Sequence, residues 1–187
     1  MLDADNVRVA LTGAVFKGPT TATAPTGTSG APTGYEDLGY ISEDGVEIAL
    51  PDAGDSEAIK AWQNGATVRI VRTPSDENPT WVFAMMETKL ETVETYFGVT
   101  VTQTATEGSF EWTNNSVRPH QSYIVDSVDG AELTRDYIPK GIVTAVESHT
   151  LTSTGATVYQ VTVEGELDGA KGFNFKRWST SLATTAP

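Results

Sequence analysis

The stretch Asp37-Leu38-Gly39-Tyr40-Ile41-Ser42-Glu43-Asp44-Gly45-Val46-Glu47-Ile48 has two short apolar segments that flank Ser-Glu-Asp-Gly. Glycine tolerates the positive φ that a tight antiparallel turn requires, so Asp44-Gly45 predicts a β-hairpin over residues 40–50. The stretch has no pattern of a nucleophile, a metal site or a phosphate-binding loop. It is an architectural motif, and it favours a structural protein over an enzyme.

The rest of the chain predicts a mainly β fold. Residues 7–16 and 67–72 alternate as strands, residues 81–86 form a more apolar strand, and residues 56–62 are expected to form one helical turn. Further strands are expected at residues 99–107, 110–113, 121–128, 132–138, 141–150, 157–164 and 173–178. The tight connections expected here are Asp129-Gly130, Pro139-Lys140-Gly141, Ser153-Thr154-Gly155 and Asp168-Gly169. With one helix, this pattern predicts a β-sandwich or split barrel with one flanking α-helix in a single domain, residues 1–187.

The one helix is expected over residues 88–97. Thr88-x-x-Glu91 has the spacing of a capping box, and Gly98 is placed to end the helix in a left-handed conformation. One apolar stripe is expected from Met86, Leu90, Val93 and Phe97. The carboxylates expected to face water are Glu87, Glu91 and Glu94.

Composition excludes several classes of function. The net charge of −13 argues against binding nucleic acid through phosphate neutralisation, although DNA could pass nearby without sticking; solubility alone explains the charge equally well. The absence of cysteine excludes disulfides and thiolate metal sites. Residues 1–5 lack the basic start of a signal peptide, and no apolar run approaches the ~20 residues that span a bilayer.

A long segment rich in Thr, Gly, Pro and Ala covers residues 18–34, and it offers almost no apolar side chain to pack on its own subunit. It is interpreted either as a floppy surface loop or as an arm that orders against neighbouring subunits. The candidate arm residues are Gly18, Pro19, Thr20, Pro25, Gly27, Gly30, Pro32 and Gly34. Residues 179–187 are expected to be a flexible tail or a second arm.

The patterns of catalytic and metal sites are weak, and no cofactor is expected. His120 and His149 lack clustered ligands and are interpreted as surface or hydrogen-bonded histidines. The carboxylates near one another, Asp52, Asp55, Glu57, Asp76 and Glu77, lack the spacing of a calcium loop. The four tryptophans could form a carbohydrate platform, but core packing is the better default for most of them.

Four segments, in order, resemble major tail proteins, the tail tube subunits of long-tailed, siphovirus-type bacteriophages. The first is Leu38-Gly39-Tyr40 with Ser42 and Asp44-Gly45-Val46, which is similar to the Leu-Gly-Tyr-x-Ser-x-Asp-Gly-Val segment of that family. The others are Ala61-Trp62-Gln63-Asn64-Gly65, the strand-to-helix stretch of residues 81–98 with Glu87-Thr88, and Ile138-Pro139-Lys140-Gly141. The second segment has Asn64-Gly65 where a Gly pair is common, and Asn also tolerates a positive φ.

The resemblance implies a non-enzymatic virion protein whose hexameric rings stack into a hollow tube, the conduit for genome ejection. Implied partners are copies of itself, the tape measure protein, and the tail terminator and distal tail proteins; genome DNA passes through the lumen without specific binding, and no membrane is involved. The implied location is the phage tail, and the host cytoplasm during assembly. Acids that would face the lumen and repel DNA are Glu132, Asp136, Glu147 and Glu164, each at a polar position of an alternating strand.

Two other interpretations stay open on the sequence. The tube protein of a contractile tail or secretion machine would share the fold. A monomeric carbohydrate-binding β-sandwich would need exposed aromatic side chains and a folded 18–34 segment, and it would not polymerise.

Overall fold

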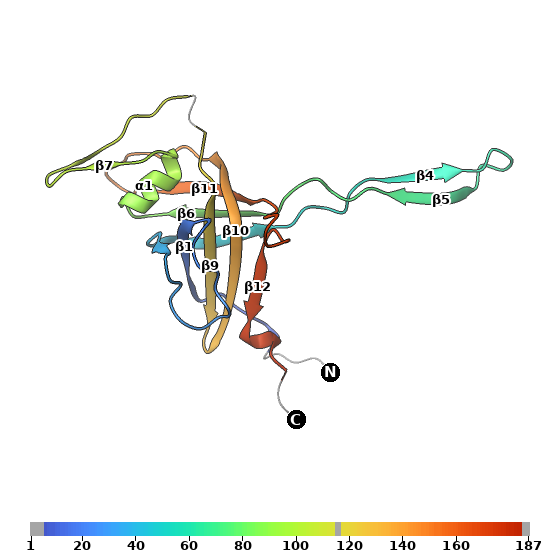
Figure 1. Cartoon of the computed structure of the whole chain (residues 1–187), viewed down its shortest axis with the longest axis horizontal. Helices are drawn as coiled ribbons and strands as arrows, with labels where there is room; N and C mark the ends of the chain where they lie inside the picture. Colours follow the sequence, from blue (N-terminus) through green and yellow to red (C-terminus); the bar gives the residue numbers. More distant parts are fainter. Residues whose placement is uncertain (1–5, 115–116, 185–187) are drawn as a thin grey trace.

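The computed structural model describes residues 6–114 and 117–184, in which antiparallel β-sheet predominates (Figure 1). The main sheet contains β1 (Thr12–Pro19), β2 (Glu36–Asp37), β3 (Ile41–Ala49), β6 (Thr80–Met85), β9 (Gln121–Asp129), β10 (Glu132–Val146), β11 (Tyr159–Gly165) and β12 (Lys176–Ser179). Two separate two-stranded sheets are formed by β4 (Ser56–Lys60) with β5 (Thr67–Arg72), and by β7 (Thr102–Gln103) with β8 (Gly108–Ser109). The helices are α1 (Leu90–Phe97) and the 3₁₀ turn η2 (Thr180–Leu182).

The long strand β10 connects two layers. Its first half pairs with β9 and β12, and its second half pairs with β11, in the order β2-β1-β9-β10-β11-β6-β3. The register against β9 shifts between Ile138 and Gly141. Pro139 has no N–H for the ladder, so the strand bulges there and turns from one layer into the other. The expected turn at Pro139-Lys140-Gly141 is therefore wrong, while the mainly β sandwich with one flanking helix is confirmed.

The main sheet buries side chains on both faces. Along β9, Tyr123 and Val125 join the inner core with Trp81, whereas Ile124 faces the other way into a smaller cluster with Tyr137. This alternation follows from the two-residue repeat of a strand. The outer cluster is covered by Tyr35, Phe16, Ala22, Ala24, Phe173 and Trp178.

Most of the stretch at residues 37–48 lies in one continuous strand, β3, which begins at Ile41. Ile41 of β3 pairs with Met85 of β6, and Val46 pairs with Phe83, so β3 advances five positions while β6 advances two. The three extra residues form a bulge in which Gly45 has φ +71°. The predicted hairpin over residues 40–50 is wrong, because a positive-φ glycine serves a bulge as well as a reversing turn.

Helix α1 ends as expected but packs differently. Gly98 is left-handed at φ 68°, which confirms the predicted end. The capping box is wrong: Lys89 caps the helix without a side-chain bond, and the Thr88 hydroxyl is hydrogen-bonded to Tyr159 instead. The buried residues are Thr92, Thr95 and Tyr96, not the predicted apolar stripe. Thr92 donates a hydrogen bond to the carbonyl of Leu38 at 3.1 Å, so tertiary contacts chose the buried face.

Several predicted boundaries also differ. Residues 56–62 were expected as a helical turn but contain strand β4, whereas the predicted strand 67–72 is confirmed as β5. Residues 7–11 and 110–113 lie outside strands. In the predicted tail, residues 179–182 belong to β12 and η2, where Thr180 accepts a hydrogen bond from the Leu133 amide at 3.0 Å. The rest of that prediction at residues 185–187, and the N-terminal residues 1–5, lie outside the described residues.

Substituting Gly39 by alanine should destabilise the fold. Gly39 has φ +83°, and an added Cβ would lie 2.6 Å from the Cδ of Glu87, whose carboxylate accepts the Tyr40 amide at 3.0 Å. We expect a loss of about 1–3 kcal/mol in the free energy of unfolding by urea. Gly45→Ala is the matched control, because Gly45 also has a positive φ but an added Cβ would meet no atom. If Gly39→Ala and Gly45→Ala lower the free energy of unfolding equally, the clash with Glu87 does not contribute to the loss.

Candidate assembly surface

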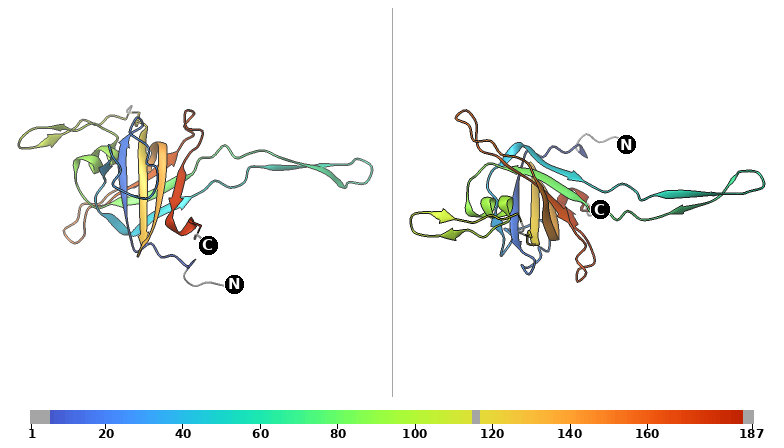
Figure 2. Two further views of the ribbon diagram at one scale, coloured as in Figure 1. Left: turned by 60° about the horizontal axis from the view of Figure 1, so that its bottom comes forward. Right: turned by 90° about the horizontal axis from the view of Figure 1, so that it is seen from above.

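The most prominent surface feature is the hairpin of residues 56–72, which comprises β4, β5 and their turn. It projects far from the two-layered body in every view (Figures 1 and 2). Its strands pair with each other from Ser56↔Arg72 to Lys60↔Thr67 and with no other strand of the described residues. All residues of both strands are exposed. This hairpin therefore gains nothing from the core of its own subunit.

The hairpin presents apolar side chains to solvent. Trp62 is 97% exposed at the turn, and Ile59, Val68 and Ile70 are exposed along the strands. Val68 and Ile70 share one face of the hairpin, whereas Ile59 pairs with Arg69 and lies on the other face. An isolated two-stranded hairpin is marginally stable in water, and apolar side chains gathered on an exposed face mark interaction surfaces. The arrangement is that of a surface built to be covered by another molecule.

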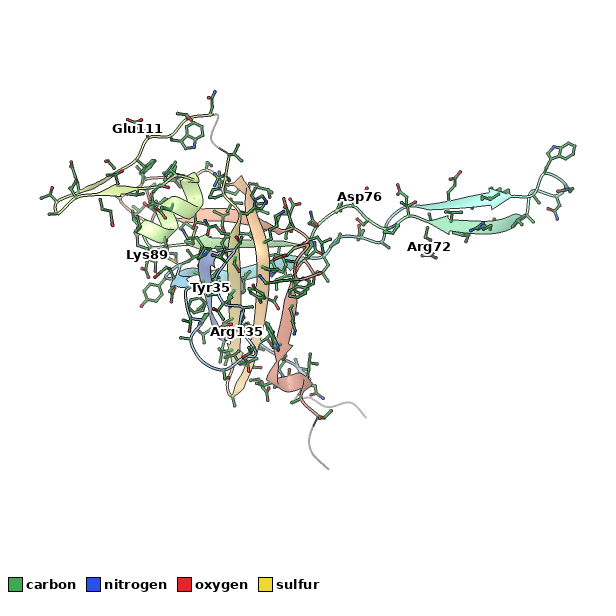
Figure 3. All side chains as sticks on the ribbon, viewed as in Figure 1. Tyr35, Arg72, Asp76, Lys89, Glu111 and Arg135 are labelled. Atoms are coloured by element: carbon green, nitrogen blue, oxygen red, sulfur yellow. The ribbon has the colours of Figure 1, made fainter. Side chains whose placement is uncertain are left out.

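The same hairpin is cationic in an acidic protein. Lys60, Arg69 and Arg72 lie on its strands, and none of them has an ion pair among the described residues. Figure 3 shows Arg72 on the hairpin, far from the body. Free cations on an exposed strand protect it against unspecific edge pairing and are available to an acidic partner.

A second, smaller projection contains β7 and β8 and lies on the opposite side of the body (Figures 1 and 2). Beside it, Trp112 is 58% exposed, while Phe110 packs against Phe97 with ring centroids 4.9 Å apart. With Trp62 and Trp112 exposed, core packing as the default for the tryptophans is wrong for two of the four. Trp81 is fully buried, and Trp178 packs against Tyr137.

The candidate arm, residues 18–34, lies against its own subunit. Ala22 and Ala24 pack on the outer cluster, so the few apolar side chains of this segment include two that its own subunit covers. Arg135 on β10 is 3% exposed and donates to the carbonyls of Gly27 at 3.2 Å and Gly30 at 3.1 Å. Figure 3 places Arg135 on the body. Whether residues 18–34 also contact a neighbour stays a prediction.

Arg135 is held by a two-pronged ion pair. Its Nε and one terminal nitrogen bond the two carboxylate oxygens of Asp126 at 2.7 and 2.6 Å. These hydrogen bonds raise the pKa of Arg135 above its ordinary value, against the opposing effect of burial. Asp126, Arg135 and residues 27–30 thus form one polar unit around a buried guanidinium, which nothing in the local pattern of the sequence indicated.

The four candidate lumenal acids occupy different environments. Asp136 is 2% exposed and bonds Arg177 twice at 2.6 Å, so a position on a solvent-filled lumen is wrong for it. Glu132 lies 4.0 Å from Arg8, and Glu164 accepts a hydrogen bond from Asn78 at 2.8 Å. Glu147 is exposed just beyond the other end of β10 from Glu132. Whether these three face a lumen stays a prediction.

The glutamates beside α1 are engaged as well. Glu94 accepts a hydrogen bond from the Val101 amide at 3.1 Å and lies 3.7 Å from the Lys17 ammonium. Burial lowers the pKa of Lys17 by more than the nearby carboxylates raise it. Glu87 accepts the Tyr40 amide. The expectation of a purely solvated face is therefore wrong for Glu87 and Glu94.

Neither histidine belongs to a metal site among residues 6–114 and 117–184. His120 lies 3.0 Å from Glu166, which also binds Lys140 at 2.6 Å, and these two partners lower the pKa of Glu166. His149 is within 3.2 Å of the Tyr96 hydroxyl. In the described part of the chain no group of three His, Asp or Glu side chains could hold a metal ion, and no helix is long and apolar enough to cross a membrane.

Comparison with known proteins agrees with this architecture. A search among curated proteins finds no match. Residues 1–175 match a family described as phage tail tube protein, and this range covers all four resembling segments, the projecting hairpin and every strand of the main sheet except β12. The chain belongs to the phage tail tube protein family.

Proposed function

We propose that this protein assembles into stacked hexameric rings that form the tail tube of a siphovirus-type phage and conduct the genome during ejection. The proposal rests on family membership and on one observation, the hairpin of residues 56–72, whose apolar side chains find no cover on their own subunit. Covering this hairpin with another copy buries apolar area and favours self-association. The role is structural rather than catalytic.

The other components follow from that role. The tape measure protein would occupy the lumen before ejection, and the tail terminator and distal tail proteins would close the two ends of the tube. The three acids Glu132, Glu147 and Glu164 are the remaining candidates for a lumenal surface that repels DNA. A net charge of −13 per subunit supports passage of DNA without binding.

Negative-stain microscopy of the concentrated full-length protein tests the proposal. We expect rings or tubes with a central channel, and sedimentation should show mass increasing with concentration. A protein that stays monomeric at millimolar concentration and is absent from virion tails would contradict it. Soluble monomers that bind an oligosaccharide through Trp62 would favour the carbohydrate-binding alternative instead.

A further inference from the structure

A cleft of about 890 Å³ opens between β1 and β3 on the body. It is lined by residues 10–15 on one side and by residues of 37–48 on the other, and its floor includes Val125 and Asp136 of the inner face. Among its walls, Leu11 and Tyr40 are more than two-thirds exposed, and Ile48 is 38% exposed. Protein interiors are close-packed, so a cleft of this size leaves the apolar side chains of its walls without packing partners.

The two strands beside the cleft have free edges. Among the described residues, β3 pairs only with β6, and β2 pairs with β1 only at Phe16 and Lys17. The Val15 carbonyl of β1 accepts the Leu38 amide, so the edge of β3 and the part of β1 before Val15 present backbone groups toward the cleft. Such edges accept an extended segment from another chain.

The cleft and the hairpin carry charges of opposite sign. No Lys or Arg occurs between Lys17 and Lys60, and that interval holds eight acids, of which Asp37 and Glu43 line the cleft. Glu87, which also lines it, has no ion pair among the described residues. The hairpin, in contrast, contains Lys60, Arg69 and Arg72 and a single acid, Glu57. The cleft and the hairpin are complementary in charge as well as in apolar character.

The hairpin cannot reach the cleft of its own subunit. It leaves the body at the end of β3 and runs outward, with Trp62 up to ~40 Å along the chain from that end. Figures 1 and 2 both show it directed away from β1. A contact between unlike surfaces of identical chains is head-to-tail, and it propagates instead of closing a dimer.

From these observations we infer that the hairpin of one copy docks in the β1–β3 cleft of a second copy, with Trp62 and the strand apolar residues against the cleft walls and its cations facing Glu43 and its neighbours. The inference rests on the proposed function, because it names the receptor for the hairpin. Complementary charges steer the contact and should make it sensitive to salt.

Charge reversal on each side tests the docking. Arg69→Glu/Arg72→Glu on the hairpin should raise the concentration needed for assembly roughly tenfold or more. The same rise is expected from Glu43→Lys in the wall of the cleft combined with Asp44→Lys at the next position of β3. Glu107→Lys/Glu111→Lys makes the same charge change as the cleft variant, on or beside the opposite projection, and should leave assembly unaltered. An equimolar mixture of the hairpin and cleft variants should assemble again, because each hairpin then meets a cleft of opposite charge.

The outcomes are distinguishable. Wild-type protein that never assembles contradicts the proposed function itself. Assembly lost in the hairpin variant but retained in the cleft variant, or no rescue in the mixture, overturns the docking alone.

A cross-link gives a second measurement, because the natural chain has no cysteine. Trp62→Cys/Ile48→Cys should form disulfides between copies only in assembled material. If Val9→Cys/Ile48→Cys forms disulfides between copies and Trp62→Cys/Ile48→Cys forms none, the cleft binds the exposed N-terminal segment of a second copy. That result would overturn the inference.

Discussion

Removing the hairpin should leave a folded subunit that cannot assemble. The amide of Thr73 donates to the carbonyl of Asp55 at 2.9 Å, so these residues can be joined by a two-residue Asn-Gly turn that replaces residues 56–72. We expect the free energy of unfolding to change by less than about 1 kcal/mol, because the deleted strands pair with each other and with no further strand in the described part of the chain. Microscopy and sedimentation should find monomers at concentrations where the full chain forms tubes.

A double substitution distinguishes the effect of the hairpin's apolar side chains on assembly from the effect of its length. Trp62→Ser/Ile70→Ser keeps the hairpin and its charges but removes much of the apolar surface that a partner would cover. We expect the assembly threshold to rise by about tenfold or more, since each buried large side chain contributes about 1.5–3 kcal/mol. Normal tubes from the deletion variant would contradict the role of the hairpin altogether.

Replacing Arg135 by methionine should cause a larger loss of stability than Gly39→Ala. It leaves the Asp126 carboxylate, whose side chain is 11% exposed, without its bidentate partner. Loss of one member of a buried pair typically costs about 3–5 kcal/mol, to be measured by urea unfolding. The segment of residues 27–30 also loses both contacts to the guanidinium, so it should be cleaved faster by a broad-specificity protease.

Two further variants separate these effects. Arg135→Met/Asp126→Leu removes the unpaired charge and should recover much of the stability, yet cleavage of residues 27–30 should stay fast. Arg135→Lys keeps the charge but cannot form the planar fork, so an intermediate loss is expected. If cleavage is unchanged in all three variants, Arg135 does not hold the candidate arm on the body.

Features that depend on residues close together in the sequence were predictable from the sequence alone. Strands β5 and β9, the end of α1 at Gly98 and the turn at Asp129-Gly130 follow from periodicity and from glycine conformation. The mainly β fold follows from many such segments, and the family followed from four segments in order. Each of these features is encoded within about ten residues and needs no knowledge of what packs against it.

The assembly hairpin could not be found in this way. Residues 56–62 were expected as a helical turn, and the apolar residues of 67–72 have the same alternation as a strand that faces a core. Exposure of Trp62, Val68 and Ile70 depends on whether another layer covers them. That is a property of the whole fold, and only the tertiary structure reveals it.

The sequence by itself determined the two-residue alternation of side chains along the strands and the acidic net charge of the chain. It also determined where glycine allows a positive φ and where proline removes a backbone N–H donor. The tertiary structure decided whether Asp44-Gly45 and Pro139-Lys140-Gly141 reverse the chain or bulge within a strand. It also decided that Arg135 and Asp136 are buried in ion pairs. The physical reason is that a bulge or a buried charge is stable only through partners distant in the sequence: the continuing ladder of β6 or β9, Asp126 and Arg177.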